Sequence, residues 1–216
     1  MQERRPSRDR RAQSAKGRLA EVERSARAAR ERVVLDAAAE VLQKRGPSGF
    51  NVREVARTAG ASTIVVYTLF GSRDALLAAL QNDWLERLAE ALQRVRKGSS
   101  LQRLGGLALA YREFALRNPQ YYGALSLGRG AGSDFARAVR LSASFRLLVD
   151  LVKQSMDDGF LAARDPESVA DSLWGLVHGI VGLELGGYFD SATTAARRLV
   201  IAGDAMLRGF GVAFRR

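Results

Sequence analysis

Few residues in this 216-residue chain could carry out covalent or metal chemistry. The chain has no cysteine, and His178 is its one histidine. Without cysteine there is no thiolate nucleophile, disulfide or Cys-ligated metal, and a single imidazole leaves little room for histidine catalysis. We therefore expect no metal and no cofactor, and the lack of cysteine suits a reducing cytoplasm.

A glycine-rich segment, Gly128-Arg-Gly-Ala-Gly132, superficially suggests a loop that binds phosphate. No predicted strand precedes it and no Lys-Ser/Thr pair follows it, so it matches neither of the known glycine-rich fingerprints. We therefore do not expect an enzyme.

The aromatic residues of the C-terminal half are better placed for binding a small molecule. Trp174 and His178 are four residues apart, a spacing at which side chains meet on one helix face. Four further aromatic residues could line the same cavity: Tyr111, Phe114, Tyr121 and Tyr122. The alternative, which we slightly favour for His178, is a core histidine bonded to a backbone carbonyl or to a tyrosine. The composition weakly suggests a hydrophobic ligand.

Glu184 follows in the same predicted helix. If it is buried it should be paired, because an isolated buried carboxylate is costly. The candidate partners are Arg112, Arg117 and Arg146, which the sequence does not rank.

Glycines form a stripe along one face of this helix, at Gly175, Gly179, Gly182 and Gly186. Each interior glycine costs a helix about 1 kcal/mol relative to alanine, so the stripe needs compensation. Close approach of another helix provides it, from the same subunit or across a two-fold axis. Gly186 alternatively serves only as a C-cap.

Positive charge is concentrated at the N-terminus. Of a net charge of +11, residues 1–32 contribute 11 Lys/Arg against 5 Asp/Glu. Residues 1–21 are low in large apolar side chains and have no steady periodicity, so we expect a disordered basic arm. Such an arm favours a polyanion, either nucleic acid or an anionic membrane, although it could also be a solvated tail.

The apolar spacing predicts helices throughout and no sheet. Gly46-Pro47 should end the first helix, and Asn51, Ser62 and Ser72 are suited to cap the next three. Glu54 is placed as in a capping box with Asn51. We expect nine helices, at residues 22–45, 52–59, 63–70, 73–96, 99–117, 121–127, 135–158, 166–186 and 191–210. The longest apolar run, 173–189, contains His178 and Glu184, so we expect a core helix and no membrane span.

The two short helices, joined by Gly60-Ala61-Ser62, have the dimensions of a helix-turn-helix. The residue types in this segment are more specific than its dimensions. They include Val52, Val55-Ala56, Ala59-Gly60-Ala61-Ser62, Tyr67-x-x-Phe70 and Ser72-Arg73-Asp74 before Leu76-Leu77. From about Arg30 to Leu80 the chain resembles the DNA-binding domain of TetR-type regulators. The resemblance implies a homodimeric transcription repressor whose recognition helix is residues 63–70.

Site residues follow from the resemblance. Thr63, Ile64, Tyr67 and Thr68 lie where such proteins touch bases and phosphates, and Arg73 replaces the usual lysine that bonds a phosphate. The DNA-binding set is completed by Asn51, Arg53, Ser62, Val65, Arg27 and Arg30. Val65 and Leu69 replace residues that are often Thr and His, so we expect Ile64 or Val65 to pack on thymine methyl groups. Val66 and Phe70 should belong to the core.

A second resemblance covers roughly Leu101 to Gly187. Trp174-Gly-Leu-Val-His178-Gly179, with Tyr111-Arg-Glu-Phe114 before it, resembles a C-terminal domain marked by Trp and His-Gly in a subset of the family. Because the last two helices of TetR-like proteins usually build a four-helix dimer interface, we favour a glycine stripe that packs across the two-fold axis.

The combined prediction is an all-α protein with three parts: an arm at 1–21, a helix-turn-helix domain at 22–72, and a ligand-binding and dimerisation domain at 73–216. We expect a cytoplasmic repressor that a small hydrophobic effector releases from double-stranded operator DNA. A transcriptional activator or an architectural DNA-binding protein of the same fold is the alternative. A basic membrane-surface protein would explain the arm but not the helix-turn-helix.

Overall fold

The computed structural model describes residues 8–119, 122 and 133–211 of the chain, and these residues form nine helices and no strand. The helices are α1 (Arg8–Gly49), α2 (Val52–Thr58), α3 (Thr63–Phe70), α4 (Arg73–Gln93), α5 (Ser100–Arg117), α7 (Ser133–Leu141), α8 (Ala143–Asp157), α9 (Pro166–Leu185) and α10 (Ala192–Gly209). The predicted all-α class is confirmed. Of the predicted helix at 121–127 only Tyr122 is among the described residues, and the segment Gly128–Gly132 after it lies outside them.

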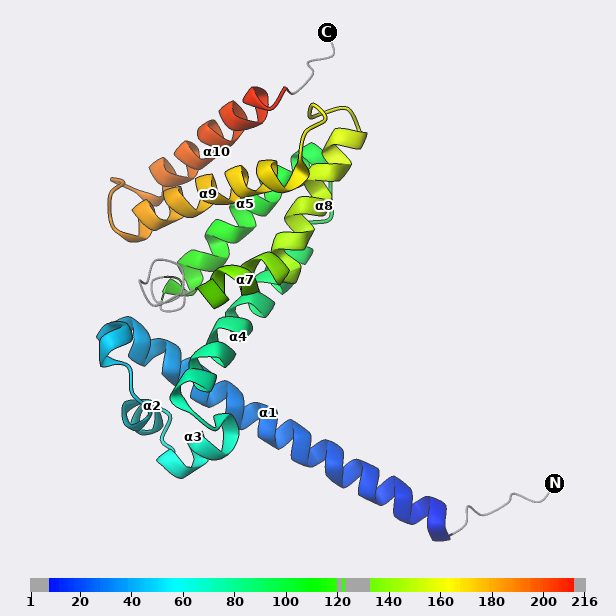
Figure 1. Cartoon of the computed structure of the whole chain (residues 1–216), viewed down its shortest axis with the longest axis vertical. Coiled ribbons are helices and arrows are strands. Elements are labelled where there is room, and N and C mark those ends of the chain that lie inside the picture. The colour runs from blue at the N-terminus through cyan, green and yellow to red at the C-terminus, as the bar shows by residue number, and fades with distance from the viewer. Residues whose placement is uncertain (1–7, 120–121, 123–132, 212–216) are drawn as a thin grey trace, which may run out of the picture.

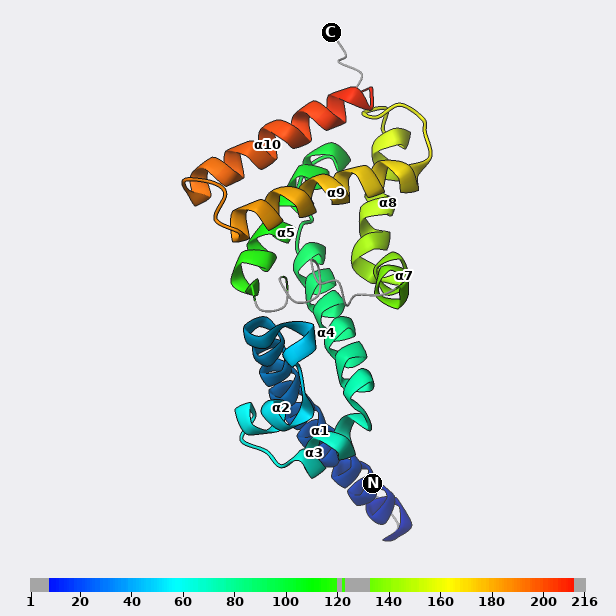
Figure 2. The ribbon, with the colours of Figure 1, turned by 60° about the vertical axis from the view of Figure 1, so that its left-hand side comes forward.

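The molecule has two lobes joined by one long helix (Figure 1). The first lobe, called the head, contains α2, α3 and the second half of α1. The second, called the body, contains α5 and α7 to α10. Helix α4 begins beside α3 and runs from the head into the body, as both views show (Figures 1 and 2).

The N-terminal half of α1 corrects the expectation of a disordered arm. Residues 8–21 are helical and continuous with the head, so no structural boundary falls at residue 22. The helix projects away from both lobes, and residues 16–25 are all exposed. Its composition explains the difference: alanine, arginine, lysine and glutamate have high intrinsic helix propensity, which needs no apolar core.

The ends of the head helices follow local sequence as predicted. Gly46 leaves helical geometry (φ 66°, ψ 178°), and the turn after α2 places Gly60 at φ 63°. The side chains of Asn51, Ser62 and Ser72 each accept the backbone N–H three residues on, at 3.0, 3.3 and 3.1 Å. Three polar caps therefore fix where α2, α3 and α4 begin.

The Glu54 carboxylate does not complete the expected capping box. It contacts Arg57 at 2.9 Å and Arg45 at 3.1 Å. The hydrogen bond from Arg57 is the main reason why the pKa of Glu54 lies below its usual value. Glu54 therefore ties α2 to the end of α1.

The predicted helix at 135–158 is two helices, α7 and α8. The Ser142 hydroxyl donates to the carbonyl of Val139 at 2.6 Å and accepts from the backbone N–H of Phe145 at 3.2 Å. The same side chain thus binds the end of one helix and caps the next. A serine inside an apolar periodic pattern concealed this break.

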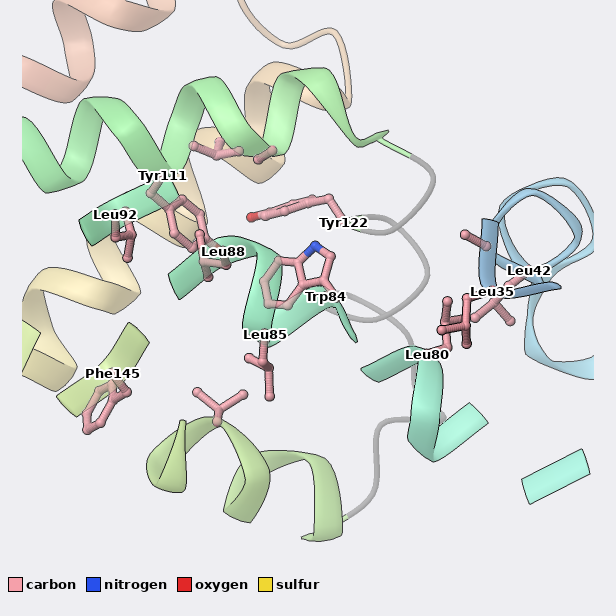
Figure 3. Close-up of a cluster of buried hydrophobic side chains, with 14 of the residues drawn as sticks. Leu35, Leu42, Leu80, Trp84, Leu85, Leu88, Leu92, Tyr111, Tyr122 and Phe145 are labelled. Carbon is pink, nitrogen blue, oxygen red and sulfur yellow. The ribbon is translucent and has the colours of Figure 1, made fainter. Parts of the chain in front are cut away.

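A continuous core links the two lobes through α4. Figure 3 follows the buried side chains from Leu35 and Leu42 of α1, past Leu80, to Trp84 and Leu88. An ion-pair network lies beside this core: Arg32 and Arg87 both contact the buried Asp83, and Arg87 also contacts Asp36. The head is therefore attached to α4 by apolar packing and by charge.

No single helix in the described ranges is both long and apolar enough to cross a membrane, although α3 and α4 pass that test together as a pair bent by 67°. Within the same ranges, no group of three acidic, histidine or cysteine side chains is placed to hold a metal ion.

We predict that Asp83→Asn destabilises the protein. The substitution keeps the shape of the side chain but removes the charge that Arg32 and Arg87 share, so the free energy of unfolding should fall by about 1–3 kcal/mol. Urea denaturation measures it. The control is Glu113→Gln, which breaks an exposed pair with Arg117 and should cost less than about 0.5 kcal/mol. Equal losses in the two variants would contradict a structural role for Asp83.

Candidate DNA-binding surface and ligand cavity

Helix α3 has one buried face and one open face. Val66 is buried and Phe70 is half-buried against the core, as expected from sequence. On the other side Ile64 is 75% exposed and Tyr67 51%, and Val65 is also exposed. The head therefore presents an outward-facing helix of eight residues with an unusually apolar surface.

The polar residues expected on α3 lie near this face. Thr63 begins the helix and is half-buried, whereas Ser62 and Thr68 are exposed. The Thr68 hydroxyl donates to the carbonyl of Ile64 at 2.8 Å, so its oxygen can still accept a hydrogen bond.

Arg73 is held in place at the start of α4. Its Nε donates to the carbonyl of Phe50 at 3.1 Å, its Nη1 contacts Asp74 at 3.1 Å, and its guanidinium lies 5.5 Å from the centre of the Phe50 ring. The side chain is 43% exposed. This arrangement fixes a cation at the junction of α2 and α4. Asn51 and Arg53 are exposed at the start of α2.

The basic residues of α1 reach the same lobe. Arg27 donates to the carbonyl of Leu69, near the end of α3, at 3.4 Å and pairs with Glu31 at 2.8 Å. Arg30 is exposed. All the residues expected to contact DNA thus lie in the head or on the part of α1 beside it, and their contact with DNA stays a prediction.

The body encloses a cavity of about 420 Å³ between α4, α5, α7, α8, α9 and α10. Its wall is mainly aliphatic and aromatic, with Trp84 and Leu88 from α4, Leu107 from α5, Phe145 from α8 and Trp174 from α9. The volume falls within the usual range of sites for drug-sized ligands.

One part of the cavity wall carries a polar pair. The Tyr111 hydroxyl and His178 Nδ1 are 2.6 Å apart, and the Trp174 ring lies 4.9 Å from the His178 ring. Behind them, Tyr122 donates to the backbone carbonyl of His178 at 2.7 Å. Burial raises the pKa of both tyrosines, so their hydroxyls stay protonated. His178 therefore combines both expectations: it is bonded to a tyrosine and it lines the cavity.

The other expected cavity residues divide into three groups. Tyr111 and Trp174 line the cavity. Phe114 and Tyr122 are not among the described lining residues: Phe114 packs against Trp84 with ring centres 5.9 Å apart, and Tyr122 is fully buried behind His178. Tyr121 lies outside the described residues. Whether these side chains contact a ligand stays a prediction.

Sequence reasoning missed the contribution of α4. Trp84, Leu85, Leu88 and Leu92 form most of one cavity wall, although they read as the apolar stripe of a connecting helix. The spacing of Trp84 and Leu88 could have predicted this contribution. Residues four apart share a helix face, and a large aromatic residue on the buried face of the linking helix should face the body.

A second missed feature is an ion pair at the edge of the cavity. Arg140 of α7 and Asp171 of α9 are 2.9 Å apart, and both line the cavity while remaining about half exposed. The Arg140 guanidinium also lies 5.7 Å from the centre of the Phe145 ring. The pair therefore marks where the cavity meets solvent.

Of the three candidate partners of Glu184, Arg112 is the one that contacts it. Its side chain is buried and receives Arg112 in a bidentate pair, with Nε to Oε2 at 2.7 Å. Arg112 also donates to the carbonyl of Ala192 at 2.9 Å, so it joins α5, α9 and the start of α10. Of the other candidates, Arg117 pairs with Glu113, and Arg146 is exposed.

The glycine stripe of α9 is open to solvent in the single subunit. Gly175 and Gly179 are exposed, and a Cβ built on either would meet nothing within 4 Å. Packing within the subunit therefore does not compensate for these two glycines. Gly182 is half-buried, and Gly186 is the C-cap of α9. Leu183 of α9 and Val200 and Ile201 of α10 are also exposed.

Two family models match the chain. Residues 34–80 match "Bacterial regulatory proteins, tetR family", and residues 104–205 match "Tetracyclin repressor-like, C-terminal domain". Among curated proteins there is no match.

Solved structures with the same fold include three informative ones. A protein of unknown function from Rhodococcus sp. RHA1 is 31% identical, with a TM-score of 0.69 over 84% of this chain and 95% of that one. A TetR-family regulator from Rhodococcus sp., described as putative, is 24% identical, with a TM-score of 0.68 over 82% and 98%. A similar regulator from Shewanella sp. PV-4 is 21% identical, with a TM-score of 0.67 over 82% and 97%.

The two matches fall on the two lobes that α4 joins, with the outward-facing α3 in one and the apolar cavity in the other. The chain belongs to the TetR family of transcriptional regulators.

Proposed function

We propose that the protein is a homodimeric, effector-responsive repressor that binds operator DNA through α3. The observation that carries this proposal is the course of α4. Its first turn holds Arg73 against Phe50 in the head, and its later turns supply Trp84 and Leu88 to the cavity wall. A ligand in the body therefore touches the same rigid element that supports the head.

Repression requires a fixed distance between two recognition helices. A symmetric pair must present its two copies of α3 about 34–36 Å apart to enter successive major grooves. A ligand that pushes on Trp84 and Leu88 tilts α4 and changes that spacing. It lowers DNA affinity only if it binds the released arrangement more tightly than the DNA-bound one.

Base and backbone contacts divide between two sets of side chains. Ile64 or Val65 packs on thymine methyl groups, and Tyr67 and Thr68 contact bases and phosphates. The positioning set for the phosphate backbone is Asn51, Arg53, Ser62, Thr63, Arg73, Arg27 and Arg30. Its basic members bind any sequence, so specificity depends on the exposed face of α3.

The dimer forms through α9 and α10. Their open surface combines the exposed glycines with apolar side chains, among them Leu183 and Ile201. A second copy that approaches the glycine stripe closely would compensate for its low helix propensity. This is also the arrangement expected from the resemblance to TetR-like proteins, and we assign the body to the C-terminal domain of the Trp-His-Gly type. We place the protein in the cytoplasm, where it meets DNA.

We predict that Ile64→Ala combined with Tyr67→Ala weakens operator binding by about 100-fold, since each exposed side chain contributes roughly 1.5 kcal/mol of apolar contact. Thermal stability should not change, because neither side chain is part of the core. A gel shift with DNA from upstream of the protein's own gene measures binding. Wild-type affinity in the double variant would contradict the role of α3.

We predict that Gly179→Leu disrupts the dimer. The subunit itself should fold normally, because a side chain at this position points into open space. Sedimentation velocity should show monomers where the wild type is dimeric. Gly105→Leu is the matched control, since Gly105 of α5 is also exposed with nothing within 4 Å. A dimeric Gly179→Leu variant would place the interface elsewhere.

We predict that deletion of residues 1–20 weakens binding to every DNA sequence alike. The arm contributes cations without base contacts, so the logarithm of affinity should also fall less steeply with the logarithm of salt concentration. Fluorescence anisotropy at several salt concentrations, with operator and scrambled duplexes, measures both effects. An unchanged salt slope would mean that the arm does not contact DNA.

A further inference from the structure

Three of the polar and aromatic residues that line the cavity are arranged along one face of α9. Asp171, Trp174 and His178 follow at i, i+3 and i+7, so they share a face, and all three line the cavity. Seven residues of helix correspond to roughly 10 Å along the axis. The ion pair at Asp171 and the polar pair at His178 are therefore separated by about the length of a small molecule, with the Trp174 ring between them.

The end at His178 is polar. Tyr111 is 5% exposed, and its hydroxyl is bonded to the imidazole at 2.6 Å. Burial raises the pKa of Tyr111 well above its usual value, so this hydroxyl stays neutral. A hydroxyl–imidazole pair can exchange a hydrogen bond with a polar atom of a ligand. The Tyr111 hydroxyl supplies no charge to balance an ion.

The end at Asp171 carries two charges that cancel. Arg140 and Asp171 face each other at 2.9 Å, and they are the only charged side chains among the described lining residues. An anion here would meet Asp171 and a cation would meet Arg140. The rest of the described wall is mainly aliphatic and aromatic. The Arg140–Asp171 pair therefore offers no net charge that could compensate for the desolvation of an ionic ligand.

We propose that the cavity takes an uncharged, elongated apolar molecule with one hydroxyl or carbonyl group, which exchanges a hydrogen bond with the Tyr111–His178 pair. The apolar part of the molecule lies against Trp174, Trp84 and Leu88 and extends toward Arg140 and Asp171. This inference rests on the proposed function in one respect only: the occupant is the effector that controls DNA binding.

A matched ligand series tests the class directly. 1-Octanol, octanoate and octylammonium have the same alkyl chain and differ in charge at pH 7. Both tryptophans of the chain line the cavity, so tryptophan emission reports on occupancy. We expect the full-length protein to bind octanol at least about tenfold more tightly than either ion, because burying an uncompensated charge is costly. Equal or tighter binding of an ion, or no binding of octanol, would overturn the proposal.

Two exposed substitutions test the cancelling charges. Asp171→Asn leaves the positive charge of Arg140 uncompensated, so octanoate should bind several-fold more tightly and octylammonium should not. Arg140→Gln should reverse this preference. Glu113→Gln is the control, since it breaks an exposed Glu–Arg pair on α5 outside the cavity lining. If both ions bind the two variants as they bind wild type, the charge pair does not select the ligand.

The polar end is tested by combining Tyr111→Phe with His178→Phe. Removing both partners avoids leaving one of them without a hydrogen bond. We expect octanol to bind about five- to tenfold more weakly, with circular dichroism to show that the variant is folded. Tyr188→Phe, which alters an exposed tyrosine, should change nothing. Undiminished octanol binding by the folded double variant would place the hydroxyl elsewhere.

DNA binding is measured separately with the same three compounds. Octanol that binds but leaves the gel shift unchanged contradicts the effector mechanism and supports the ligand class. If octanoate or octylammonium releases the DNA, the effector mechanism is supported and the proposed ligand class is contradicted.

Discussion

Helix α4 is the constraint on which the rest of the structure depends. Its cap at Ser72 and its first residue, Arg73, belong to the head, whereas Trp84, Leu88 and Leu92 belong to the cavity wall. Asp83 lies between these parts and binds Arg32 of α1. Because interiors are close-packed, a displacement of the cavity wall cannot be absorbed locally and must move the helix. The geometry of the head on the body is thus set by one element and its charged attachment to α1.

The surfaces left open are as informative as the contacts. Within the subunit, charge-assisted hydrogen bonds from Arg112 to Glu184 and to the carbonyl of Ala192 connect α5, α9 and α10. The outer side of the same helices shows Gly175 and Gly179 with empty space above them, and α3 shows Ile64. The buried Glu184 carboxylate is thus fully paired within the subunit, whereas these glycines and large apolar side chains are exposed. Exposed surfaces of this kind favour contact with a partner over contact with solvent.

Features that depend on contacts between residues close in sequence could be predicted, whereas features that depend on long-range contacts could not. The caps at Asn51, Ser62 and Ser72 act within three residues, so their spacing alone predicted where α2, α3 and α4 begin. The prediction of a disordered arm was wrong because low hydrophobicity was taken as evidence of disorder. The high helix propensity of the same residues favours the helix α1. The membership of Trp84 in the cavity depends on neighbours distant in sequence. The break at Ser142 is set by Val139 and Phe145, three residues away, but the apolar periodicity around it concealed this signal. His178 shows the limit clearly: spacing placed it beside Trp174, but only the fold brought Tyr111 to its ring.

The position of the polar pair relative to α4 bears on how a ligand would be sensed. Tyr111 and His178 belong to α5 and α9, whereas Trp84 and Leu88 belong to α4. A molecule whose polar atom is bonded to α5 and α9 would act on α4 through van der Waals contact with its apolar part. The anchoring group then determines which molecule stays in the cavity, and the apolar bulk determines how far α4 moves. Affinity and release would thus depend on different parts of one ligand, because only contacts that differ between the two arrangements shift the equilibrium.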